Sequence, residues 1–77
     1  MIKTQRLSFR KLRGRIIERY GILSKFAKAM GISSQTLSAK MNKKSGWTQD
    51  EIVRACGLLG IDIEREVGTY FFELEVQ

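Results

Sequence analysis

Histidine is absent from this 77-residue chain, and cysteine occurs once, as Cys56. A zinc site of the usual Cys/His kind is therefore excluded, no disulfide can form within the chain, and we expect no metal and no other cofactor. The sequence also lacks an apolar run of about 18 residues, the length that a membrane-spanning helix needs. Its basic N-terminus lacks the apolar segment of a secretory signal peptide. We therefore expect a cytoplasmic protein with no membrane partner.

Acidic residues are scarce in the first part of the chain. Residues 1–44 contain twelve Lys and Arg residues and one acid, Glu18, which gives a charge of +11. Residues 45–77 contain two Arg residues and seven acids, which gives −5. Such segregation directs one part of a protein toward a polyanion, and double-stranded nucleic acid is the simplest such partner.

An enzyme is not expected from this sequence. General acid–base catalysis needs titratable groups that converge, whereas the acids here are scattered over the C-terminal half and histidine is missing. The sequence also has no glycine-rich phosphate loop of the P-loop or dinucleotide-binding spacing. We therefore expect neither a catalytic site nor a small-molecule substrate.

Two short helices joined by a tight turn are predicted near the middle of the chain. Apolar spacing indicates the first helix over Ser24–Met30. Gly31 follows as a helix stop, since the residue after a last turn often needs a positive φ that glycine tolerates. Ser33 and Ser34 then offer hydroxyl groups that can cap the N–H groups of a second helix.

The second helix has an unusual outer face. Leu37 and Met41 are spaced i, i+4 and are predicted to face inward. The opposite face carries small or uncharged polar side chains, namely Gln35, Ser38, Ala39 and Asn42. Gln, Ser and Asn side chains hydrogen-bond base edges in a major groove, so this order predicts a helix-turn-helix. An ordinary helical hairpin inside a bundle is the alternative, which the basic charge disfavours.

Residues 1–7 form a basic arm, and a helix follows it. We interpret the arm either as a segment that lies on DNA or as a disordered terminus. Ser8 is the predicted N-cap of a helix that runs to Tyr20, and Gly21 ends that helix. Its predicted apolar stripe consists of Phe9, Leu12, Ile16, Ile17 and Tyr20.

A strong local signal starts the next helix. Thr48 and Glu51 form a capping box, and Trp47 and Ile52 have the spacing of a hydrophobic staple around it. We expect Gly60 to end this helix, whose predicted inner face contains Ile52, Cys56 and Leu59. Asp62 can cap one further turn, Ile63–Val67, which we expect Gly68 to end.

The tail, residues 69–77, changes character. Aromatic and aliphatic residues alternate there with a period of two, which is typical of a strand. We expect the partner of such a strand to be either the N-terminal arm or another copy of the chain. In the second case the dimer interface would consist of Tyr70, Phe72, Leu74 and Val76. The alternative is an aromatic plug, in which Tyr70–Phe72 packs under the helices.

Five segments carry a family resemblance: KLRGRIIE (11–18), KFAKAMGIS (25–33), TLSAKMN (36–42), WTQDEI (47–52) and YFF (70–72). With them the chain resembles the phage Cro/repressor type of helix-turn-helix domain, and most narrowly an uncharacterised Cro-like family of temperate phages of Gram-positive bacteria. The resemblance implies a single all-α, five-helix, lambda-repressor-like domain over residues 1–77. It also implies a transcriptional regulator that binds phage operators as a homodimer in the bacterial cytoplasm.

The resemblance assigns roles to two groups of residues. Those implied to read bases are Ser34, Gln35, Ser38 and Ala39. Those implied to hold phosphates are Ser24, Lys25, Asn42, Lys43 and Lys44. Lysines in the loop after a recognition helix lie at the groove edge, where they bind phosphate.

Two positions depart from the family pattern. Ile22 and Leu23 stand where the family usually has Thr-Gln, whose Gln binds a phosphate. Lys40 stands where an apolar residue is common, and we expect its stem to lie along the core while its ammonium reaches outward. The apolar pair favours the alternative function, a protein-interaction module such as an antirepressor that binds a phage repressor.

Overall fold

Residues 7–74 are described by the computed structural model, and they contain five helices and a two-stranded antiparallel ladder. In chain order the elements are β1 (Leu7–Ser8), α1 (Arg10–Tyr20), α2 (Leu23–Met30), α3 (Ser34–Met41), α4 (Gln49–Leu59), α5 (Val67–Phe71) and β2 (Glu73–Leu74). The predicted all-α class with five helices is confirmed.

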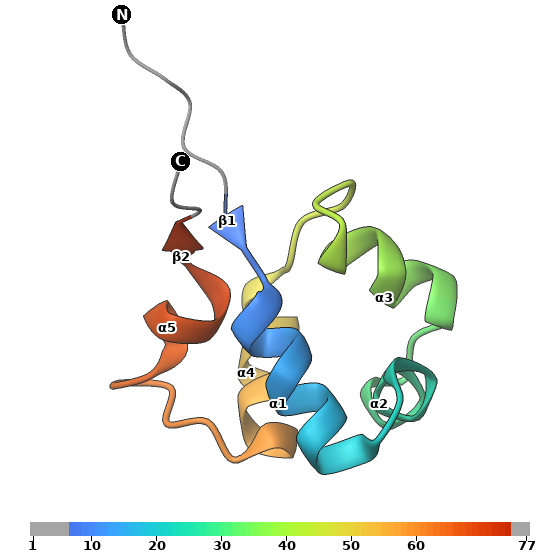
Figure 1. Ribbon diagram of the computed structural model, residues 1–77, viewed down its shortest axis with the longest axis horizontal. Helices are drawn as coiled ribbons and strands as arrows, with labels where there is room; N and C mark the ends of the chain where they lie inside the picture. The colour runs from blue at the N-terminus through green and yellow to red at the C-terminus, as the bar shows by residue number, and fades with distance from the viewer. Residues whose placement is uncertain (1–6, 75–77) are drawn as a thin grey trace, which may run out of the picture.

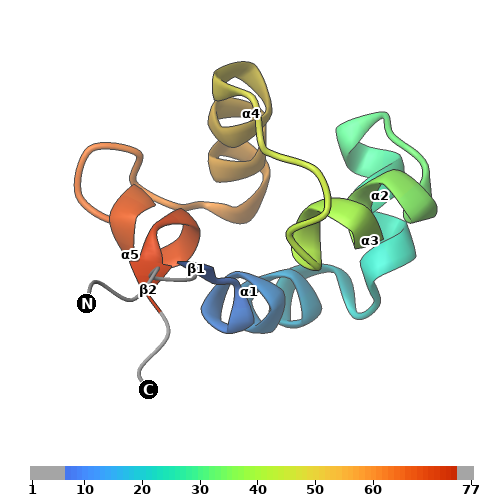
Figure 2. The same ribbon diagram turned by 90° about the horizontal axis from the view of Figure 1, so that it is seen from above.

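The helices surround one apolar interior. In Figure 1, α1 lies in front of α4, with α2 and α3 on one side and α5 on the other. The view from above in Figure 2 separates α1 from α4 and shows the same two flanking groups. Each helix contributes a fully buried side chain to the core, for example Leu12, Phe26, Leu37, Leu59 and Phe71. The position of α3 is therefore fixed by packing against the other helices.

The turn between α2 and α3 forms as predicted. Gly31 has a φ of 78° in the left-handed region, and Ile32 N donates to Ala27 O at 3.0 Å. This is the hydrogen-bond pattern of a Schellman motif, which satisfies carbonyls at a helix end. Ser33 then caps α3, because its Oγ accepts a hydrogen bond from Thr36 N at 3.0 Å.

The ends of α4 are both satisfied. The predicted capping box is present: Thr48 N donates to Glu51 Oε1 at 2.8 Å, and Glu51 N donates to Thr48 Oγ1 at 3.2 Å. At the other end Gly60 has a φ of 67°, and Arg15 Nε from α1 donates to Leu59 O at 2.8 Å. These bonds fix α4 against α1.

Two details of α1 differ from prediction. Phe9, not Ser8, is the N-cap residue, and its side chain makes no capping hydrogen bond to the first turn of α1. The reason is that Ser8 belongs to β1 and pairs with Glu73. Ile17, predicted to lie in the buried stripe, is 43% exposed, whereas Leu12 and Ile16 are fully buried.

The tail was predicted as a strand from Tyr70 onward, and this is wrong for its first residues. Tyr70 and Phe71 lie in α5, where Phe71 is fully buried and Tyr70 packs against the core. Gly68 does not end a helix, since it lies inside α5. The aromatic-plug alternative therefore holds for Tyr70 and Phe71, but Phe72 is 54% exposed.

The short strand at the end of the tail pairs with the N-terminal segment of the same chain. Leu7 pairs with Leu74 and Ser8 with Glu73 in β1 and β2, which lie side by side in Figure 1. Lys11 Nζ in α1 lies 3.2 Å from Glu73 Oε2. The arm thus supplies the partner strand, one of the two options that the sequence left open. The rest of the arm, residues 1–6, and Val76 lie outside the described residues.

Cys56 lies in the core, on the inner face of α4. Cys56 is buried and free, and burial, reinforced by the charge of Glu66, raises the pKa of its thiol. It is therefore a protonated core residue at neutral pH.

Between residues 7 and 74 no helix has the length and apolarity needed to cross a membrane.

Candidate nucleic-acid interface

The outer face of α3 carries the predicted base-reading residues. Ser34, Gln35 and Ser38 are exposed, and Ala39 is half-buried beside them. Leu37 and Met41 point to the core from the opposite side of the helix. Because helical residues three and four apart lie on the same face, the four side chains form one short, uncharged strip.

Predicted phosphate-binding residues lie at the start of α2 and directly after α3. Ser24 and Lys25 are exposed in the first turn of α2. Asn42, Lys43 and Lys44 are exposed just after α3, where Asn42 Nδ2 donates to Ser38 Oγ at 3.4 Å. The predicted phosphate-binding residues are therefore all exposed, while their roles stay predictions.

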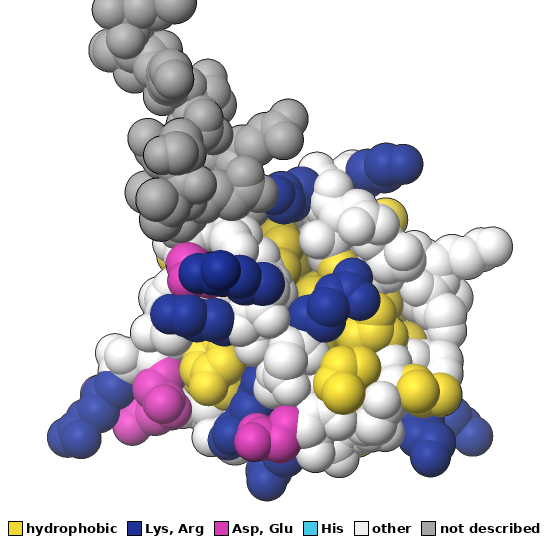
Figure 3. All heavy atoms as spheres, in the orientation of Figure 1, with side chains coloured by type: hydrophobic (Ala, Val, Ile, Leu, Met, Phe, Trp, Pro, Cys, Tyr) yellow, Lys and Arg dark blue, Asp and Glu magenta, His cyan; other side chains and the backbone are white. Residues whose placement is uncertain are grey.

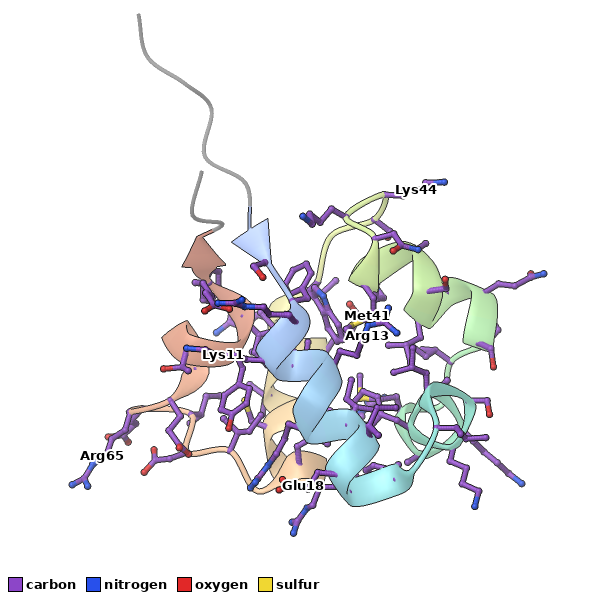
Figure 4. All side chains as sticks on the ribbon, viewed as in Figure 1. Lys11, Arg13, Glu18, Met41, Lys44 and Arg65 are labelled. Atoms are coloured by element: carbon purple, nitrogen blue, oxygen red, sulfur yellow. The ribbon has the colours of Figure 1, made fainter. Side chains whose placement is uncertain are left out.

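Lys43 has an uncommon backbone conformation. Its φ of 65° lies in the left-handed region, which costs a non-glycine residue about 1 kcal/mol. Lys43 N donates to Lys40 O at 3.2 Å, and Lys44 N donates to Ala39 O at 2.8 Å, the pattern of a Schellman motif. A lysine thus stands at the position that glycine usually takes. The turn directs Lys44 away from the body of the molecule, as Figure 4 shows.

Lys40 does not reach outward, so that prediction is wrong. Its side chain is buried, and its Nζ donates to Glu51 Oε1 at 2.8 Å and to Gly46 O at 2.9 Å. The same ammonium lies 5.8 Å from the ring centroid of Trp47. The hydrogen bond from Lys40, and then that from Thr48 N–H, lowers the pKa of Glu51. The buried pair connects α3 to the start of α4 and holds the intervening loop.

A polar groove of about 370 Å³ separates the start of α1 from the end of α3. Arg10 and Arg13 line it from α1, and Asn42 and Lys43 line it from the α3 side. Figure 4 shows Arg13 next to Met41. Neither arginine was among the predicted phosphate-binding residues. Their i, i+3 spacing was the available signal for a shared face, but it does not reveal that α3 lies beside it.

Charge is distributed unevenly around α3. In Figure 3 the surface over α3 is mostly white, which marks uncharged side chains and backbone, with basic side chains at its edges. The acidic side chains visible in that view lie over other parts of the molecule. Among the described residues, Glu18 of α1 forms an ion pair with Arg15 at 2.9 Å, so its charge is compensated locally. A polyanion approaching α3 therefore meets no acidic barrier on this face.

Ile22 and Leu23 lie at the start of α2. Ile22 is the N-cap residue of α2 and is 54% exposed, and it gives α2 no side-chain cap. Leu23 packs partly against the core. Neither side chain can donate a hydrogen bond to phosphate.

Comparison with known proteins places the chain in a family. A family model described as a protein of unknown function (DUF739) matches residues 6–74. The chain belongs to the DUF739 family. A similar solved structure is that of the modulator of repression (MOR) of the temperate bacteriophage TP901-1 from Lactococcus lactis. That protein is 37% identical to this chain with a TM-score of 0.77, and the match covers 92% of this chain and 95% of that one. No curated protein matches the chain.

These matches confirm the coarser part of the predicted resemblance. The chain is a helical protein of the DUF739 family and is similar to a regulatory protein of a temperate phage. Its assignment to the Cro/repressor type, its binding of DNA and its dimerisation stay predictions. No group of three or more His, Cys, Asp or Glu side chains able to hold a metal occurs within residues 7–74.

Proposed function

We propose that this protein is a non-enzymatic regulator of phage repression that binds double-stranded operator DNA through α3. The observation that carries the proposal is the uncharged strip on α3, made by Ser34, Gln35, Ser38 and Ala39, with exposed lysines at its edges. Side chains of these types read base edges in the major groove, and lysines hold the flanking phosphates.

Gln35 has the main base-reading role in this proposal. It lies near the N-terminal end of α3, the part of a recognition helix that contacts base edges. Its amide can bond adenine N6 and N7 in bidentate fashion, and the methyl group of Ala39 can contact a thymine methyl group. Ser34 and Ser38 can each bond more than one base, so they contribute less to specificity.

Backbone and side chains share the phosphate contacts. Since Ile22 leaves the first turn of α2 without a side-chain cap, the N–H groups of Ser24 and Lys25 have no competing side chain. Helix N-termini of this kind favour phosphate. In the loop after α3, Lys44 and Lys43 hold phosphates. The cost of the backbone conformation of Lys43 is consistent with a functional role for its side chain.

Two copies bind neighbouring half-sites in this proposal, and they associate on the DNA. One recognition helix contacts only a few base pairs, whereas a dimer reads two half-sites about 34–36 Å apart. One edge of β2 already pairs with β1 of the same chain, and Phe71 is buried in the core. Of the tail residues predicted to form a dimer interface, Phe72 alone among those with described side chains is largely exposed.

Chemical-shift mapping by NMR tests the DNA-binding proposal. On addition of a 20-base-pair duplex, amide signals of Ser34–Asn42, Lys43 and Lys44 should shift, while those of α5 should not. A Gln35→Ala, Ser38→Ala variant should lose base-dependent shifts, whereas Gln49→Ala, on the exposed start of α4, should behave as the wild type. Shifts confined to α4 and α5, or no shifts at low salt, would contradict the proposal.

A protein-interaction module is the second candidate, and one observation favours it. Ile22 lies directly before the position of the family's phosphate-binding Gln and exposes more than half of its surface, and Ile17 is also exposed. Exposed apolar side chains at a functional edge are typical of protein contacts. The similar phage protein is a modulator of repression, and modulation of repression fits either mechanism.

Ile22→Thr distinguishes the two candidates. A threonine N-cap should stabilise α2 by about 1 kcal/mol, and its hydroxyl group would compete with phosphate for the N–H groups of the first turn, so binding of duplex DNA should weaken. If the protein instead binds a phage repressor through Ile22, the same change should weaken that complex, as measured by calorimetry with the purified repressor. Ile22→Val keeps an apolar β-branched side chain and should alter neither measurement appreciably.

A further inference from the structure

An apolar pocket lies beside the loop that joins α3 to α4. Its volume is about 310 Å³, and we call it the aromatic pocket. Its apolar lining consists of Phe9, Trp47, Ile52, Phe71 and Phe72. The volume is at the lower end of the range of about 300–1,000 Å³ found for ligand sites. The pocket is thus large enough for a bulky side chain from a partner.

The ring of Trp47 forms part of a rigid aromatic group. Its centroid lies 5.1 Å from that of Phe71 in an edge-to-face arrangement and 6.4 Å from that of Phe9. Its indole Nε1 is buried, and among the described residues it has no hydrogen-bond acceptor. Buried donors without acceptors are uncommon and costly in folded proteins.

The rim of the aromatic pocket is basic. Among the described residues that line it, Lys43 and Lys44 alone are charged, and both belong to the loop after α3. Phe72 is 54% exposed at the same rim. No described acidic residue lines the pocket, and the carboxylates next in sequence to Ile52 and Phe72 are paired, since Glu51 bonds Lys40 and Glu73 contacts Lys11. An acidic occupant is therefore electrostatically complementary to this rim.

We propose that the aromatic pocket docks a bulky apolar side chain of an acidic segment in a partner protein. The apolar side chain enters between Trp47 and Phe72, and the flanking carboxylates approach Lys44. The regulatory consequence of this docking rests on the proposed function. In the proposed DNA complex Lys44 also holds a phosphate, so an occupant of the pocket competes with DNA. The docking itself is independent of whether the protein binds DNA.

Fluorescence of Trp47, the single tryptophan of the chain, reports on the pocket directly. The full chain is titrated with the capped peptide Glu-Glu-Leu-Phe-Glu-Glu. Two control peptides replace Leu-Phe by Ala-Ala or all four Glu by Lys. We expect a saturable emission change with the first peptide only. Phe72→Ala and Lys44→Ala should weaken it several-fold, while Lys28→Ala, on the exposed side of α2, should leave it unchanged.

A competition arm separates the docking from the proposed function. If the protein binds duplex DNA, the Leu-Phe peptide should displace the duplex from the wild type more readily than from Phe72→Ala. If no duplex binds, the proposed function fails, but the fluorescence titration still decides the docking. The docking proposal is overturned by equal binding of the Ala-Ala or the Lys peptide, or by no saturable change. It is also overturned by an emission change that follows protein concentration alone, which would make a second copy the occupant.

Discussion

The ammonium of Lys40 lies 2.8 Å from Oε1 of Glu51, and both side chains are largely removed from solvent. The same carboxylate oxygen accepts a hydrogen bond from Thr48 N, so one atom serves both the capping box of α4 and the ion pair with α3. Because Lys40 also bonds Gly46 O, the pair fixes the whole loop that carries Lys44. The proposed phosphate-binding edge of α3 therefore depends on a buried interaction behind it.

Lys40→Met should lower the free energy of unfolding by about 1–3 kcal/mol, because it leaves a carboxylate and a carbonyl without their donor. Urea denaturation measures the change. Lys28→Met, at an exposed position of α2, is the control and should shift stability by no more than about 0.5 kcal/mol. An equal effect of the two substitutions would show that the buried pair does not stabilise the fold.

Stability should fall in acid partly through Glu51. The hydrogen bonds from Lys40 and from Thr48 N–H lower its pKa in the folded state below the ordinary value of 4.5. Its contribution is therefore complete above pH 4.5 and is lost as the pH falls through the lowered, folded-state pKa. Glu51→Gln should flatten the pH dependence of the unfolding midpoint in that acid range, and Lys40→Met should flatten it in part. An unchanged pH dependence of the unfolding midpoint in both variants would contradict this assignment.

Much of the fold was predictable because its signals are local. The Thr48–Glu51 capping box and the Gly31 turn depend on residues within a few positions of one another, and both form as expected. The inward placement of Leu37 follows from helical periodicity in the same way. Local chemistry therefore sets the ends of α3 and α4 and the face that α3 turns outward.

The wrong predictions concern residues whose burial or conformation depends on contacts with distant parts of the chain. Lys40 is buried because Glu51 and Gly46 reach it from the next loop and helix, and its own helix gives no sign of them. The tail alternates like a strand, but burial of Phe71 against the helices makes it helical. The groove between Arg13 and α3 likewise depends on how α1 packs. Tertiary contacts overrode local preference in each case.

Lys44→Ala should weaken the binding of specific and random duplexes alike. The slope of log K against log salt should become shallower by about 0.9, and by about 2 when Lys43→Ala is added. The reason is that each phosphate contact that is lost reduces the number of counterions released on binding. Arg65→Ala removes a cation from the opposite end of the molecule (Figure 4) and should leave the slope unchanged. Equal slopes for wild type and Lys44→Ala would mean that this lysine is merely solvated.

Gln35→Ala should relax base preference at one position of each half-site and cost about 1–3 kcal/mol in specific binding, because it removes a bidentate contact. Gln49→Ala changes the same side chain on the exposed start of α4 and serves as the matched control. Binding constants for single-base variants of the site measure the effect. Uniformly weaker binding with an unchanged preference would assign Gln35 a phosphate or packing role instead.

Operator binding is tested most directly by selecting bound duplexes from a random pool, with the sedimentation of the complex measured alongside. We expect an enriched sequence with two-fold symmetry, half-sites about one helical turn apart, and two protein chains per duplex. No enrichment over the starting pool, together with binding of a purified phage repressor, would contradict DNA recognition by α3 and establish the interaction module in its place.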